Sequence, residues 1–81
     1  MKNYEVDRIE KAKRMFDKCG WEIIDSDEDY ILKRKKYDEY LIILSKRFKT
    51  VTFNHTSIEL NVMKALNTMI FELGWYKQYE D

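Results

Sequence analysis

The spacing of hydrophobic residues changes twice along this chain and divides it into a helix, a set of strands and a second helix. Between residues 3 and 19 the apolar side chains recur every three or four positions, which is typical of a helix with one buried side. Gly20 follows the last of them, and a glycine just beyond the final apolar position is a common helix end. The pattern therefore predicts a first helix over about residues 3–19.

The same helical spacing returns near the carboxyl end, over about residues 57–73. Thr56 and Glu59 stand three residues apart, as in a capping box, so we expect them to cap the start of this helix. Gly74 is placed to end it in the left-handed conformation. We expect residues 75–81 to form a short exposed tail, although Trp75 can fold back over the last turn.

Four short segments between the predicted helices are rich in β-branched and aromatic residues and are separated by polar turns: 21–25, 30–36, 39–45 and 49–53. Turns at this spacing favour a meander of neighbouring antiparallel strands. We therefore predict one α+β domain over residues 1–81, with its sheet at about 21–53 and the order α-β-β-β(-β)-α. Whether the first strand pairs in the main sheet is left open. Each helix has one apolar side, so we expect both on one face of the sheet.

The third predicted strand is apolar on both of its sides. Ile42 and Leu44 point one way, and Leu41 and Ile43 point the other. Some apolar surface is therefore expected on the sheet face that the helices leave open. Long lysine and tyrosine neighbours are one explanation for such a surface, because their stems can cover it. A docking surface for another protein or for a second copy of the chain is the alternative.

Composition limits the classes of function. The 81 residues carry 15 basic and 15 acidic side chains, so no overall charge draws the chain to nucleic acid or to a membrane surface. A single cysteine cannot form an internal disulfide, which fits a reducing compartment. The first residues lack the apolar core of a signal peptide, and no run of residues reaches membrane-spanning length. We expect a cytoplasmic protein that contacts no membrane.

The charges are unevenly distributed, because residues 30–53 hold seven basic and only two acidic side chains. Basic and aromatic residues together can contact phosphates and stack on bases. The nucleic-acid hypothesis names Lys33, Lys35, Lys36, Tyr37, Lys46, Arg47 and Lys49. The alternative is that these lysines protect the edges and turns of the sheet from aggregation.

Residues for catalysis or metal binding are scarce. His55 and Cys19 are single residues of their kinds. The acidic run from Asp25 to Asp29 has the opening spacing of a calcium loop, but Tyr30 and Lys36 stand where that loop needs glycine and glutamate. We expect no metal, no cofactor and no enzymatic activity. The acidic run is instead a candidate surface for a protein partner.

Two stretches end in glycine and tryptophan, Cys19-Gly20-Trp21 and Leu73-Gly74-Trp75. With the strand Thr50-Val51-Thr52-Phe53, they resemble small uncharacterised proteins of phages and mobile elements of low-GC Gram-positive bacteria. The final residues, Gly74 to Asp81, are also similar in style to a small type II-A anti-CRISPR inhibitor of Cas9. The resemblance implies a helix, a short antiparallel sheet, a second helix and an aromatic-acidic tail that serves in binding a protein.

The sequence thus favours a non-enzymatic protein-binding accessory protein of a phage or mobile element, with an anti-defence inhibitor as one version. Its expected partner is a host or phage protein, with a homodimer through the open sheet face as a further expectation. A small nucleic-acid-binding module is the alternative function. The candidate partner-binding residues are Asp25, Asp27, Glu28, Asp29, Trp75, Tyr76, Tyr79, Glu80 and Asp81.

Overall fold

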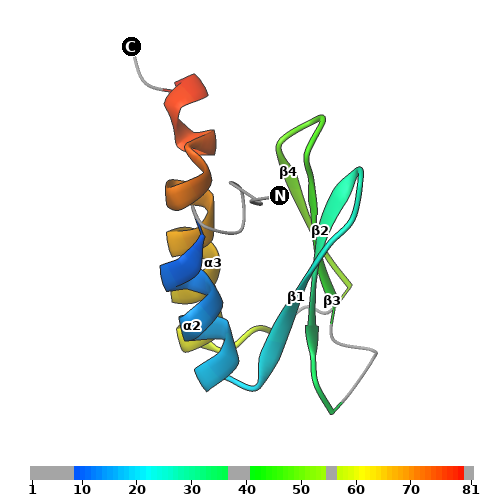
Figure 1. The fold of residues 1–81 in the computed structure, drawn as a ribbon, viewed down its shortest axis with the longest axis vertical. Helices are drawn as coiled ribbons and strands as arrows, with labels where there is room; N and C mark the ends of the chain where they lie inside the picture. Colours follow the sequence, from blue (N-terminus) through cyan, green and yellow to red (C-terminus); the bar gives the residue numbers. More distant parts are fainter. Residues whose placement is uncertain (1–8, 37–40, 55–56, 80–81) are drawn as a thin grey trace, which may run out of the picture.

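The computed structural model describes residues 9–36, 41–54 and 57–79, with side chains up to Lys77. A four-stranded antiparallel sheet forms one layer, and two helices lie on one of its faces as the other layer (Figure 1). The α+β class and the predicted element order are confirmed. The elements are α2 (Glu10–Lys18), β1 (Trp21–Asp25), β2 (Asp29–Arg34), β3 (Leu41–Ser45), β4 (Thr50–Phe53), α3 (Leu60–Leu73) and the 3-10 helix η1 (Trp75–Tyr79).

The strands follow one another across the sheet in chain order, β1-β2-β3-β4, and each neighbouring pair is antiparallel. β1 pairs with β2 from Trp21 opposite Arg34 to Asp25 opposite Tyr30. The first strand therefore belongs to the main sheet, which settles the question that the sequence left open. The amino-terminal part of the first predicted helix, residues 3–8, lies outside the described residues.

The hydrophobic core lies between the helices and one face of the sheet. Tyr30 and Leu32 from β2 are buried there, as are Phe16 from α2 and Met69 from α3. The full set of buried residues is Ile9, Ala12, Phe16, Trp21, Tyr30, Leu32, Ile42, Leu44, Val62, Ala65, Leu66, Met69 and Leu73. Both helices contribute to one continuous cluster, which confirms that they cover the same sheet face.

Both helices end at the glycines, as the sequence predicts. Gly20 has φ of +80° and Gly74 has φ of +77°, which is the left-handed region that other residues rarely adopt. Each following tryptophan packs inward. The Trp21 ring lies 6.4 Å from the Phe16 ring of the preceding helix, between ring centres. The Trp75 ring lies 6.2 Å from the ring of Tyr30 in β2, so it connects the end of α3 to the sheet.

Two predicted boundaries near the carboxyl end are wrong. α3 begins at Leu60, and Glu59 occupies its N-cap position without any capping hydrogen bond from its side chain. Glu59 therefore does not act as the third residue of a capping box, and Thr56 lies outside the described residues. Ile58 packs against the core from the extended segment before the helix, and this contact fixes the later start. The segment after Gly74 is likewise no exposed tail at its start, because Trp75 is half-buried in η1.

The start of α2 is capped by a residue from the other helix. Ile9 stands at the N-cap position and offers no side-chain hydrogen bond. The backbone N–H of Ala12, in the first turn, donates instead to Oε1 of Glu72 at 2.8 Å. A carboxylate at this position satisfies an otherwise unpaired N–H and lies near the positive end of the helix dipole. Glu72 therefore links the two helices by a polar contact beside the core.

We expect Glu72→Ala to lower the free energy of unfolding by about 1–2 kcal/mol, as the loss of a helix cap does. Glu59→Ala is the matched control, because Glu59 stands at the N-cap position of α3 but makes no side-chain capping bond; its cost should be below about 0.5 kcal/mol. Urea denaturation followed by circular dichroism measures both. Equal costs for the two variants would contradict the role of Glu72.

Candidate functional site

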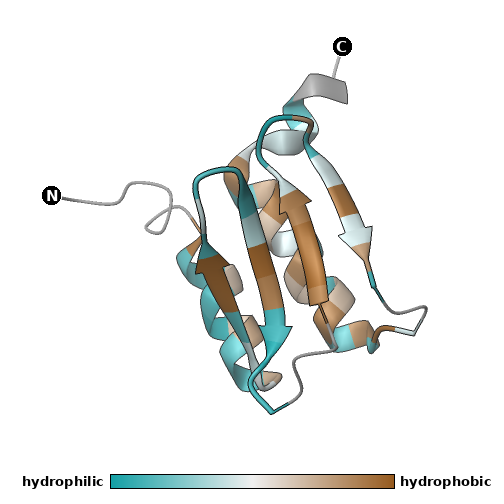
Figure 2. Ribbon diagram, turned by 90° about the vertical axis from the view of Figure 1, so that its right-hand side faces the viewer, coloured by the Kyte–Doolittle hydropathy of each residue, from teal (hydrophilic) through white to brown (hydrophobic). Residues whose placement is uncertain are grey.

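The sheet face turned away from the helices, here called the open face, carries a row of isoleucines. Ile24 lies opposite Ile31, Ile31 lies opposite Ile43, and Ile43 lies opposite Thr52. These residues alternate with the buried residues of the same strands, so their side chains point away from the helices. Figure 2 views this face directly, with hydrophobic residues running across the middle of the sheet.

Leu41 stands two residues from Ile43 on β3 and extends the row along the strand. Ile24 is 40% exposed, and the other three side chains are half-buried. Side chains in directly opposed positions touch across strands, so these four form one surface. We call Ile24, Ile31, Leu41 and Ile43 the open-face patch. An apolar surface with a polar rim is a typical protein-docking site.

Charged and polar residues surround the open-face patch. Lys33 Nζ lies 3.6 Å from Oε1 of Glu22, beside the isoleucine row in one direction along the strands. Asp29 and Ser45 lie opposite each other beside the row in the other direction. Lys33 therefore extends toward Glu22 at the rim and leaves Ile24 exposed. Two tyrosines near β3 in the sequence, Tyr37 and Tyr40, lie outside the described residues.

Alternation along the third predicted strand indicates that Leu41 and Ile43 lie on one face of the sheet. It did not identify Ile24 and Ile31, which lie on β1 and β2. The overlooked signal was the apolar pair within each of the first two strands. Ile23 and Ile24 are adjacent on β1, as are Ile31 and Leu32 on β2. Neighbouring residues of a strand point to opposite faces, so each pair must place one apolar side chain on the open face.

An ion pair connects the predicted acidic surface to one of the predicted basic residues. Lys46, which follows β3, forms an ion pair with Asp25 and donates to the backbone oxygen of Ser26. Its Nζ also lies 4.6 Å from the centre of the Tyr30 ring. Lys46 therefore neutralises part of the acidic run and holds two turns together. Asp27 and Glu28 are the exposed acidic side chains at this end of the sheet.

The residues of the nucleic-acid hypothesis are not gathered on one surface. Register places Lys33 and Lys35 toward one end of the sheet, whereas Lys46, Arg47 and Lys49 follow the other end of β3. Lys33 pairs with Glu22, Lys35 with Asp17 and Lys46 with Asp25. Arg47 lies over the ring of Phe48, and Lys49 lies over the ring of Trp75. Tyr37 is outside the described residues, and Lys36 is exposed.

These contacts weaken the electrostatic argument for nucleic acid, because a paired lysine has less free charge to offer a phosphate. The local excess of basic residues along the sequence is partly offset by acids from α2 and β1. Nucleic-acid binding therefore stays a prediction that rests on the sequence.

The predicted binding tail is partly buried. Trp75 packs against the core and is shared between Tyr30 and Lys49. Tyr76 is 38% exposed, and its hydroxyl donates to Oδ1 of Asn67 at 2.6 Å. The side chains of Tyr79, Glu80 and Asp81 lie outside the described part of the chain. Of the tail residues predicted to bind a partner, only Tyr76 is therefore seen at the surface.

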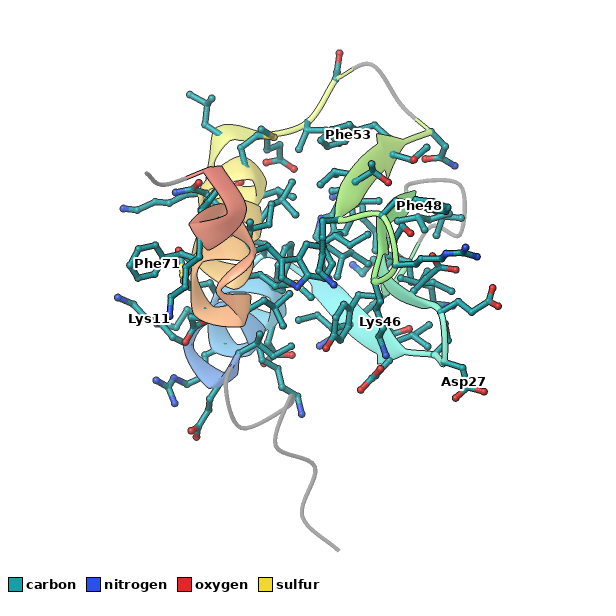
Figure 3. All side chains as sticks on the ribbon, turned by 90° about the horizontal axis from the view of Figure 1, so that it is seen from above. Lys11, Asp27, Lys46, Phe48, Phe53 and Phe71 are labelled. Carbon is teal, nitrogen blue, oxygen red and sulfur yellow. The ribbon has the colours of Figure 1, made fainter. Side chains whose placement is uncertain are left out.

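Further exposed apolar residues lie elsewhere. Leu60 and Phe71 on α3 are 86% and 73% exposed, and Phe48 in the turn before β4 is 67% exposed. Figure 3 shows Phe71 on the side of the helices away from the sheet, at the opposite side of the molecule from Phe48. These residues are separated from one another, and single exposed apolar side chains are common on protein surfaces. They serve as controls for the open-face patch.

A hollow of about 590 Å³ lies between α2 and β1, and its lining includes Lys13, Arg14, Asp17 and Trp21. Its charges pair locally, as Arg14 does with Glu10 at 3.3 Å. No group of three metal-binding side chains occurs among residues 9–36, 41–54 and 57–79. Cys19 is a free, half-buried thiol at the edge of the core. His55 lies outside the described residues.

Family models, curated proteins and solved structures yield no significant match to this chain. The resemblance to phage proteins and to an anti-CRISPR inhibitor therefore remains an expectation from the sequence. Within the described helices, none combines the length and hydrophobicity needed to cross a membrane.

The ion pair between Lys35 and Asp17 predicts a contribution to stability that depends on pH. The hydrogen bond from Lys35, together with its charge, lowers the pKa of the Asp17 carboxyl below its ordinary value of 3.8. A lowered pKa in the folded state stabilises the protein above the ordinary pKa, and this contribution is lost as pH falls through the folded-state pKa. Because Asp17 is exposed, the contribution is small.

We therefore expect Asp17→Asn to reduce stability slightly at pH 7 and to have a smaller effect at pH 2. Glu10→Gln is the control for removing an exposed carboxylate on the same helix. Urea denaturation between pH 7 and pH 2 measures the difference between wild type and each variant. A difference for Asp17→Asn that grows toward low pH would contradict the assignment.

Proposed function

We propose that this chain is a non-enzymatic protein-binding domain that docks a protein partner on the open-face patch. The observation that carries the proposal is the row of Ile24, Ile31 and Ile43, which the sheet register aligns on the open face. These three side chains and Leu41 point away from the helices and are not part of the hydrophobic core cluster. Burying an isoleucine fully is worth about 1.5–3 kcal/mol, so a partner that covers this row gains binding energy.

The rim gives the proposed site its orientation. Lys33 and Glu22 lie beside the row in one direction along the strands, and Asp29 and Ser45 lie beside it in the other direction. Charges at the rim of an interface select among partners and fix the direction of docking more than they add affinity. The same arrangement offers no nucleophile or paired acid and base within the patch, which is why we propose binding as the function.

The proposal is tested with Ile31→Lys and Ile43→Lys, introduced together. A charge in the centre of a docking surface must be desolvated, so both substitutions should abolish capture of a specific partner from a Gram-positive host lysate. The control pair is Leu60→Lys with Phe71→Lys, which alters two more exposed apolar residues on α3. The control should retain the partner.

Thermal melting by circular dichroism confirms that each variant is folded before capture. The open-face substitutions should cost more stability than the α3 pair, because Ile31 and Ile43 are half-buried and directly opposed, so the two lysines repel each other. Loss of the partner in the α3 pair, with retention in the open-face pair, would move the site to the helices and overturn the proposal.

An anti-defence role in a phage or mobile element is the narrower version of this function, and sequence resemblance alone supports it. A Cas9 interference assay in bacteria tests it. Expression of the chain should restore plasmid transformation if it is an inhibitor, and Ile31→Lys with Ile43→Lys should remove that effect. Full interference in the presence of the folded wild-type chain would rule out this version.

A further inference from the structure

The central strand of the open face has opposite charges placed symmetrically about one isoleucine. Asp29, Ile31 and Lys33 lie on β2 at alternate positions, so all three point to the open face. Two residues along a strand span about 6.6 Å. A negative side chain and a positive side chain therefore stand at equal distances on either side of Ile31. Two copies of the chain can therefore pair through this arrangement.

A two-fold axis that lies between two facing sheets, runs across the strands and passes over Ile31 makes the arrangement self-complementary. Rotation about this axis places each strand over the same strand of a second copy, in the reversed direction. Ile24, Ile31 and Ile43 then each face themselves. Asp29 faces Lys33 of the second copy, and Lys33 faces Asp29 of the second copy. Sheets that pack face to face keep their strands within about 30° of one another, which permits this match.

The other two-fold axis in the same plane runs along the strands and gives a poorer match. When this axis passes over β2, it places Asp29 over Asp29 and Lys33 over Lys33 of the second copy, so like charges meet. When it passes midway between β2 and β3, it places β1 over β4 of the second copy, so Ile24 faces Thr52. It also places Lys33 over Leu41, because the register pairs these residues across β2 and β3. Burying a lysine charge against leucine is unfavourable. The charges therefore select the axis that runs across the strands.

We propose that a second copy of this chain occupies the open-face patch, with Asp29 of each copy paired to Lys33 of the other. This inference rests on the proposed function and names the protein that docks. Four strands at about 4.8 Å spacing and five residues of about 3.3 Å each give a face of roughly 19 by 17 Å. A face of this size covers about 320 Å² per copy, which is below the size of a standard specific interface, so we expect a weak, transient dimer that dissociates at high micromolar concentration or above.

Charge reversal tests the pairing. Sedimentation equilibrium from about 1 μM to about 1 mM should show that the wild type dimerises. Asp29→Lys should weaken self-association at least about tenfold, because like charges then face each other at both symmetric contacts. Glu22→Lys with Lys33→Glu should weaken it similarly, while the 3.6 Å ion pair between these two positions is kept with reversed sign.

Mixing the two variants gives the decisive result. In a mixed dimer the introduced lysine of one variant faces the introduced glutamate of the other, and the two unchanged residues also form an opposite pair. The equimolar mixture should therefore associate about as tightly as the wild type. A wild type that stays monomeric over the whole range, or a mixture no tighter than either variant alone, would overturn the proposal.

Disulfide trapping gives a second measurement that does not depend on charge reversal. In a Cys19→Ser background, Ile31→Cys places a thiol on the proposed axis, so air oxidation should link two copies. Met63→Cys is the control, because Met63 is exposed, at 40%, but lies on α3. Cross-linking that is equal for the two positions would count against the proposed face.

The results separate this inference from the function on which it rests. A monomeric wild type that still captures a different protein, lost in Ile31→Lys with Ile43→Lys, would overturn the second-copy proposal and leave the docking function standing. A monomeric wild type that captures no specific protein would overturn both. Rescue in the mixed sample would support both, because it shows a protein docked on the open face in the stated orientation.

Discussion

The register of the sheet decides which side chains meet the helices and which remain at the surface. Side chains alternate between faces, so a slip of one residue would exchange the two sets. The centre of β2 does not prevent such a slip by hydrophobicity, because Ile31 and Leu32 are both apolar. Residues further along the strand must fix it: Tyr30 fills the core beside Trp75, and a slip would turn Lys33 toward the helices. Large aromatic and charged residues therefore set the register that creates the open-face patch.

The fold was largely predictable because its signals are local. Helical periodicity, glycine at the helix ends and turn spacing each depend on a few neighbouring residues, and the left-handed Gly20 and Gly74 follow directly from them. The start of α3 was not predictable in this way. There, a local capping pattern competed with the packing of Ile58 against a core that only the folded chain provides. Trp75 shows the same limit, because its partner Tyr30 lies on a distant strand.

The sequence predicted an apolar surface on the open face but did not identify all the residues that form it. Alternation on β3 indicated an apolar open face, yet which residues complete it depends on how β1 and β2 align with that strand. The charges are a clearer case. The basic excess of residues 30–53 suggested a surface for phosphate, but Lys35 meets Asp17 from α2 and Lys46 meets Asp25 from β1. Charge counted along a sequence does not reveal pairs that form between distant segments.

The capping of α2 by Glu72 bears on the order in which this protein folds as it is synthesised. The bond joins residues 60 positions apart, so α2 lacks its cap until α3 has been made. A helix of nine residues is marginal in isolation. α2 should therefore form stably only after α3 leaves the ribosome. Until then both faces of the sheet stay exposed, and each apolar face would need to be kept from neighbouring chains.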